Sequence, residues 1–322
     1  MKKVLKWTGI VLGTLILIIL ILAAWIQFSA TPKHEVKPVD IVLPTDSLSL
    51  ARGQKIVTTI CAYCHLGEDG KLSGKMISPA SEPGFGELWS ANITQHPTKG
   101  IGSYTDGELA YLLRTGVNRD GRMSGIMMRF PKMSDADVAA LIAYLRSDAG
   151  IVQPSEAVHP FPEYPNKFLG KFLTKIGVFD PLPYDGTPIT TPDPSDQVAY
   201  GRYLSTGVYE CFVCHSASFE TNNELDPEKS ANYFGGGNLI TDDEFNNVPS
   251  RNITPSKTHG IGNWTAEQFS AAIRTGVRPD GSMLKVQMPR FANLDEQEVA
   301  AIWAYLQTVP AIDTDPLATD SK

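Results

Sequence analysis

The chain begins with one long apolar stretch and becomes amphipathic after it. No charged residue occurs between Trp7 and Ala30, and three lysines precede this stretch. About 20 apolar residues are enough to span a bilayer as a helix, and the lysines favour an N-terminus on the cytoplasmic side. The pattern therefore predicts a transmembrane anchor over residues 1–30. A cleaved signal peptide is the alternative, but its apolar region would be shorter, and Phe28 stands where cleavage after Ala30 would require a small residue.

Two later segments place apolar residues at the spacing i, i+3, i+4, i+7, which predicts one buried face of a helix. The first of these helices is expected to begin near Ser134 and the second near Leu294. Their apolar positions are Val138, Leu141, Ile142 and Leu145 in the first, and Val299, Ile302, Trp303 and Leu306 in the second.

Local start and stop signals predict another pair of helices. Thr105 and Thr265 are each followed three residues later by Glu or Gln, which is the capping-box pattern. Gly116 and Gly276 are placed to end these helices. Because long strand-like runs are absent, the fold is expected to be mostly α.

These paired elements belong to a tandem repeat. The phrases Asn-Ile-Thr, Gly-Ile-Gly, Arg-Thr-Gly-Val and Asp-Gly occur in the same order twice, beginning at Asn92 and again at Asn252. Such self-similarity predicts two copies of one domain, over residues 47–150 and 196–310. In each copy a helix, over about 47–62 and 196–211, is expected to lead into a cysteine pair. The remaining segments are the anchor, 1–30, a tether, 31–46, a proline-rich crossover, 151–195, and a polar tail, 311–322. Within the crossover, the apolar segment 168–173 is expected to pack between the two domains.

Composition narrows the function. A hydrophobic content of 42% indicates a globular protein, and the net charge is −7. The anchor holds three of the 28 basic residues and no acidic one, so the rest carries 25 basic against 35 acidic residues, a charge of −10. Nucleic-acid binding is disfavoured because it usually requires a basic surface. The four cysteines form two identically spaced pairs, which argues against a disulfide framework.

Each cysteine pair is followed directly by histidine: the two motifs are Cys61-Ala-Tyr-Cys64-His65 and Cys211-Phe-Val-Cys214-His215. Positions three and four apart share one helix face, so two sulfurs and one imidazole can point at one object. Cys-x-x-Cys-His is the attachment signature of c-type haem. A zinc site made by both pairs and a thioredoxin-like dithiol are the alternatives, but neither explains the two histidines. The sequence therefore predicts two covalently attached haem c groups, with His65 and His215 bound to iron.

Methionine is the expected sixth iron ligand. In the second copy Met288 precedes proline in a stretch with little helical character. In the first copy, alignment from the nearby Arg-Phe pair gives Met127, and alignment from Asp-Gly gives Met128; the closer anchor favours Met127. Filling core gaps is the usual role of methionine, but the matching positions favour ligation, which raises the haem potential. Arg114 and Arg274 are candidates to pair with haem propionates; solvent-facing arginines at a helix end are equally consistent with the sequence.

The arrangement resembles class I c-type cytochromes. The finer phrases, together with Tyr104-Thr105, Trp264-Thr265 and Met288-Pro289, are similar to those of the cytochrome subunits of membrane-bound alcohol, gluconate and related dehydrogenases, over nearly all of residues 47–310. Those subunits usually carry three haems, whereas this chain has two attachment motifs, and Met127-Met128 stands where the family has Met-Pro. The resemblance implies electron transfer to quinone or a terminal oxidase, not chemistry on a substrate by this chain.

The sequence as a whole thus predicts a membrane-anchored dihaem cytochrome that passes single electrons on the periplasmic side, between a dehydrogenase and quinone or a terminal oxidase. Two other functions remain open. A dihaem redox enzyme, of peroxidase or thiosulfate-oxidising type, would need an open iron position, against which the paired methionines argue. A haem-based sensor would need an output module, for which no residues are left over.

Overall fold

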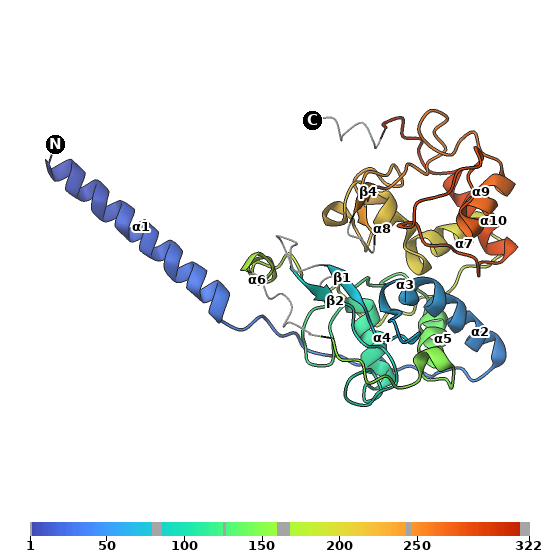
Figure 1. Cartoon of the computed structure of the whole chain (residues 1–322), viewed down its shortest axis with the longest axis horizontal. Coiled ribbons are helices and arrows are strands. Elements are labelled where there is room, and N and C mark those ends of the chain that lie inside the picture. The colour runs from blue at the N-terminus through green and yellow to red at the C-terminus, as the bar shows by residue number, and fades with distance from the viewer. Residues whose placement is uncertain (1, 79–85, 125–126, 160–167, 243–245, 316–322) are drawn as a thin grey trace.

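The computed structural model describes residues 2–78, 86–124, 127–159, 168–242 and 246–315. The described residues are mostly helical, and an N-terminal helix projects from a globular body (Figure 1). This helix, α1 (Lys2–Phe28), is long and apolar enough to cross a membrane, and Ile26 is its single buried residue. A signal sequence near the N-terminus can meet the same criteria of length and hydropathy. The prediction of an apolar helix at the N-terminus is confirmed.

Three helices build the first half of the body: α2 (Ser47–Ile56), α4 (Asp106–Thr115) and α5 (Asp135–Leu145). Both α2 and α4 pack against α5. The approach of α2 to α5 is so close that a Cβ atom on Gly53 would overlap the carbonyl oxygen of Ala140. A residue with a side chain cannot occupy this position without separating the helices.

The second half has the same arrangement of helices: α7 (Gln197–Tyr203), α9 (Ala266–Thr275) and α10 (Glu296–Leu306). Here α7 and α9 both pack against α10. A Cβ atom on Gly201 would overlap the carbonyl oxygen of Ala301, as at the equivalent glycine of the first half. Most buried apolar side chains of both halves form one continuous cluster, and Tyr111, Val117 and Met123 form a second, smaller one.

The helix ends predicted from the sequence are confirmed. Thr105 and Thr265 each complete a capping box, and Gly116 and Gly276 end their helices with left-handed φ angles of 82° and 83°. A left-handed residue at this place favours glycine, which has no Cβ to clash. Asp295 caps α10, one residue later than the expected start. The predicted apolar faces are buried, except that Trp303 is half-buried.

Several short elements were not predicted. Two antiparallel hairpins occur, β1 (Met76–Ser78) with β2 (Leu88–Trp89) and β3 (Leu239–Thr241) with β4 (Asn247–Pro249). Three 3₁₀ turns lie at Gly150–Val152, Phe219–Thr221 and Pro227–Lys229. Strands of two or three residues leave no period-2 pattern long enough to detect.

The apolar part of the crossover is a helix, α6 (Phe168–Lys175), and it does not pack between the two halves. It contacts α1, near whose end it lies in Figure 1. Phe168 and Leu169 are each 45% exposed, which a position inside the body would not allow. The expectation that this segment fills the space between the halves is therefore wrong. The apolar composition indicated that this segment would pack against something, but it predicted neither the helix nor the partner of its apolar face.

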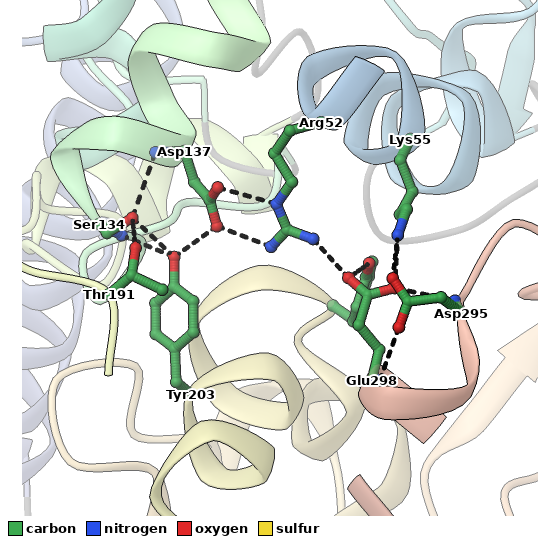
Figure 2. Close-up of polar contacts among 9 residues, drawn as sticks. Arg52, Lys55, Ser134, Asp137, Thr191, Tyr203, Asp295 and Glu298 are labelled. Atoms are coloured by element: carbon green, nitrogen blue, oxygen red, sulfur yellow. Dashed lines mark hydrogen bonds and ion pairs between the residues drawn. The ribbon is translucent and has the colours of Figure 1, made fainter. Parts of the chain in front are cut away.

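A buried ion network joins the two halves (Figure 2). Arg52 on α2 donates two hydrogen bonds to Asp137 on α5, at 2.8 and 2.7 Å, and one to Glu298 on α10, at 2.5 Å. Lys55 donates to the other oxygen of Glu298 at 2.8 Å, and the Tyr203 hydroxyl donates to Asp137 at 2.6 Å. Burial lowers the pKa of Arg52, but its carboxylate partners outweigh burial and raise that pKa. The network therefore holds α2 against both α5 and α10.

Candidate haem sites

A π-helical turn leads into each cysteine motif, and Cys61 is the last residue of the first turn. The helix that begins as α2 widens into a π turn at Val57–Cys61, and the helix that begins as α7 widens at Leu204–Val208. A π turn holds one more residue per hydrogen-bonded ring than an α turn, and such turns are frequent at functional sites. The side-chain oxygens of Thr59 and Ser205, one in each turn, are buried without a hydrogen-bond partner. No residue pattern in the sequence predicts these turns.

The first motif combines two thiols with a neutral imidazole. Cys61 precedes the short helix α3 (Ala62–His65), and Cys61 and Cys64 are half-buried and form no disulfide. Burial lowers the pKa of His65, although its hydrogen bond to Ala91 acts in the other direction. The Nδ1 atom of His65 lies 2.7 Å from the carbonyl oxygen of Ala91, so Nδ1 carries the proton and donates. The lone pair on Nε2 is then available to a metal, as in metal-bound histidines generally.

The second motif has the same contacts. Cys211–His215 forms helix α8, its cysteines are free, and the Nδ1 atom of His215 lies 2.8 Å from the carbonyl oxygen of Arg251. Burial again lowers the pKa of this histidine. A donor set of two thiols and one neutral imidazole fits the two thioether bonds and the iron bond of haem c.

The repeated Asn-Ile-Thr phrase explains why both carbonyls are in place. Ala91 and Arg251 each come directly before its asparagine. The side-chain oxygen of Asn92 accepts from the backbone N–H and the hydroxyl of Thr94, at 3.0 and 2.6 Å. Asn252 makes the same two bonds in the second half, at 2.8 and 2.7 Å. The turn fixed by this asparagine presents the preceding carbonyl to the histidine, so the repeat of the phrase was the signal for these partners.

The two motifs lie close together in the body. The hydroxyl of Tyr63, between the first two cysteines, donates to the carbonyl of Gln287 at 3.2 Å, and Gln287 directly precedes Met288. Burial raises the pKa of the Cys214 thiol to about 12, and the neighbouring Cys64 adds to this effect. The first cysteine motif therefore contacts the loop that carries Met288, and Cys64 is near enough to Cys214 to affect its pKa.

The candidate methionine ligands lie in loops beside the core. Met127, Met128 and Met288 are half-buried and pack against the apolar cluster. The backbone N–H groups of Met127 and Met288 each donate to the carbonyl three residues earlier, at 3.1 and 3.2 Å. Met127 and Met288 therefore lie in similar turns, and the choice between Met127 and Met128 as a ligand stays a prediction. Ligation of iron by these residues stays a prediction.

The two candidate propionate ligands differ in their surroundings. Arg114 is buried, donates to the carbonyls of Phe130 and Met133, and pairs with Asp135 at 2.6 Å. These contacts tie α4 to the start of α5. Arg274 is half-buried at the end of α9. Propionate binding by either arginine stays a prediction, and the structural role of Arg114 was missed because its partners lie 16 to 21 residues away.

In each half, one helix leads into Cys-x-x-Cys-His and the last helix packs against it. This arrangement resembles that of class I c-type cytochromes. The sequence model of the cytochrome c family matches residues 50–148. A cytochrome c domain implies covalently bound haem c.

Comparison with individual proteins narrows the resemblance. The chain is 28% identical over 274 residues to the fructose dehydrogenase cytochrome subunit of Gluconobacter japonicus, covering 82% of this chain and 53% of that protein. It is 27% identical over 263 residues to the cytochrome c subunit of a quinone-dependent alcohol dehydrogenase from Komagataeibacter europaeus, covering 78% and 54%. The chain thus spans about half the length of these subunits. A dihaem cytochrome c-type protein of Cereibacter sphaeroides is 27% identical over 278 residues, covering 82% of this chain and 86% of that protein.

Proposed function

We propose that this protein is a membrane-anchored dihaem c-type cytochrome that transfers single electrons outside the cytoplasm, between a dehydrogenase and quinone or a terminal oxidase. Its parts are the anchor, 1–30, the tether, 31–46, two cytochrome c domains, 47–150 and 196–310, the crossover between them, 151–195, and the tail, 311–322. The matched lengths of this chain and the dihaem relative support two haems. The names of the dehydrogenase subunits support the class of electron donor.

One observation carries the proposal: both cysteine motifs present a half-buried histidine whose Nδ1 donates to a backbone carbonyl at 2.7 or 2.8 Å. His65 and His215 would bind the two irons through Nε2, and the four cysteines would form the thioethers. Bound haem c supplies one-electron chemistry. The protein holds each imidazole in one tautomer and orientation, which raises its strength as a ligand.

The methionines complete the proposed ligand sets. Met288 is assigned to the haem of the second domain and Met127 to that of the first, with Met128 as the other candidate there. A neutral thioether stabilises ferrous iron and leaves no open position for a substrate. This favours electron transfer over the chemistry of a redox enzyme or a gas sensor.

The closeness of the two motifs supports transfer between the haems within one chain. Tyr63 contacts the loop that carries Met288, and Cys214 lies near Cys64. The acidic surface outside the anchor would complement cationic patches on soluble partners and would make their association sensitive to salt.

The test begins with the full chain purified in detergent. Covalent haem remains with the protein after acid–acetone extraction, and we expect two haems per chain, falling to one in either His65→Ala or His215→Ala. Colourless protein, or protein holding zinc, would overturn the proposal. Met288→Ala should open one iron to carbon monoxide and lower the potential of that haem. Met283→Ala is the matched control, because Met283 is 57% exposed and should leave both haems unchanged.

A further inference from the structure

Helix α6 has one face that the protein leaves uncovered. Phe168, Leu169, Phe172 and Ile176, the residue after the helix, are 45%, 45%, 36% and 57% exposed. At 3.6 residues per turn these four positions fall within an arc of about 100°. Gly170 and Thr174 are buried on another side of the helix. A contiguous exposed apolar face usually marks an interaction surface.

The lysines of α6 fix it to the end of α1. Lys171 donates to the carbonyl of Gln27 at 2.9 Å, and Lys175 donates to the carbonyl of Ala30 at 3.1 Å and to the hydroxyl of Ser29. The Lys175 ammonium also lies 4.6 Å from the ring centroid of Trp25. The last carbonyls of a helix lack intrahelical donors, so these lysines satisfy groups that α1 cannot satisfy by itself.

The position of Trp25 gives the depth at which α6 lies. Trp7 and Trp25 are 18 residues apart, which corresponds to about 27 Å along a helix. This is close to the roughly 30 Å thickness of a bilayer's hydrocarbon core. Tryptophan is enriched at both boundaries of that core. If α1 is the proposed anchor, Trp25 marks its outer boundary, and α6 lies at the same level.

From these observations we infer that α6 is a membrane-interface helix, whose apolar face inserts among the lipid acyl chains next to the exit of α1. The occupant of the uncovered face is the lipid surface itself, because that surface is continuous with the lipid around α1. The inference rests on the proposed anchor. It adds that the body is held by two contacts with the membrane, α1 and α6, which together fix its tilt.

The inference also specifies the kind of lipid contact. Lys171 and Lys175 both donate hydrogen bonds to the end of α1. We therefore expect the apolar face of α6, and not the charge of these lysines, to provide the binding to lipid. The association of α6 should therefore be similar on neutral and on anionic membranes, whereas a charge-driven surface would prefer anionic lipid.

The test uses the full haem-loaded chain in nanodiscs that contain phosphatidylcholine with a diazirine on an acyl carbon near the headgroup. After illumination, mass spectrometry locates the lipid on peptides. We expect label on α1 and on residues 168–178, with a similar yield when phosphatidylglycerol is included. The double variant Leu169→Glu/Phe172→Glu should reduce the α6 label about tenfold or more, because it removes two apolar side chains from lipid and adds two charges.

Leu48→Glu is the matched control, since Leu48 is an exposed leucine on α2, at 82% exposure, far along the chain from α6. It should leave the α6 label unchanged. Label on α1 without label on α6 would overturn the inference and indicate a protein partner or a second copy on this face. Absence of label from both would overturn the anchor as well. Haem content, read from the visible spectrum of the same sample, tests the proposed function independently of either labelling result.

Discussion

Arg52 is the residue on which we expect the joint between the two halves to depend most. Its side chain is 19% exposed, and its partners Asp137 and Glu298 are 7% and 2% exposed. The substitution Arg52→Met keeps much of the side-chain length and removes the charge. Two buried carboxylates would then lose their common partner.

The expected loss in the free energy of unfolding depends on the hydrogen bonds that the two carboxylates keep. Removing one partner of a buried ion pair costs about 3–5 kcal/mol, because the other charge stays buried without compensation. In this network Lys55 still donates to Glu298, and Tyr203 still donates to Asp137. We therefore expect a loss near the lower end of that range, about 3 kcal/mol of the free energy of unfolding.

The assay is urea unfolding of the full chain in detergent, followed by far-ultraviolet circular dichroism. Arg202→Met is the matched control, because Arg202 is 54% exposed and pairs with Glu228 at the surface; the expected loss there is about 0–1 kcal/mol. Adding Asp137→Asn and Glu298→Gln to Arg52→Met should recover part of the loss, since amides are far less costly to bury than unpaired carboxylates. Equal losses for the two arginine variants, or no recovery in the triple variant, would refute the reasoning.

Two further predictions concern packing and pH. Gly201→Ala should separate α7 from α10, because the new methyl would overlap the carbonyl oxygen of Ala301. Urea unfolding should show a loss of stability of about 1–3 kcal/mol or more. Gly150→Ala is the control, and it should change the stability little because Gly150 has open space around it. Burial, with a contribution from Glu224, raises the pKa of Glu210 well above its usual value of 4.5. An acid with a higher pKa in the folded state binds more protons when folded, so its contribution to stability falls as the pH rises above the unfolded pKa. The stability of Glu210→Gln relative to wild type should therefore rise as the pH is raised from 4 to 7. A stability difference between the two proteins that does not vary with pH would contradict this.

The sequence predicted those parts of the fold that depend on neighbouring residues. Thr105 and Thr265 cap their helices through side chains three residues away, and Gly116 and Gly276 end them through their own backbone freedom. The four apolar positions that begin at Val138 are buried because the helical period alone places them on one face. The histidines of the two motifs were found in the same way, since each follows its cysteine pair directly.

The parts that escaped prediction depend on distant partners. The π turns before the cysteines are set by packing, and no residue type at Val57–Cys61 or Leu204–Val208 signals them. The apolar composition of residues 168–173 predicted neither helix α6 nor its place beside α1. Arg52 and Glu298 are 246 residues apart, so no local pattern connects them. Sequence alignment left both Met127 and Met128 open, because the Asp-Gly and Arg-Phe pairs give alignments that differ by one residue.

The hydrogen bond from Tyr63 to Gln287 has a consequence for the order of events during biosynthesis. The two residues are 224 positions apart, so nearly the whole chain must be made before this contact can form. Chains fold progressively from the N-terminus as they are synthesised. The first thiol pair, which flanks Tyr63, thus stays uncovered on that side throughout translation, whereas the second pair emerges beside a neighbour that is already in place. An attachment enzyme has the longer access to the first pair.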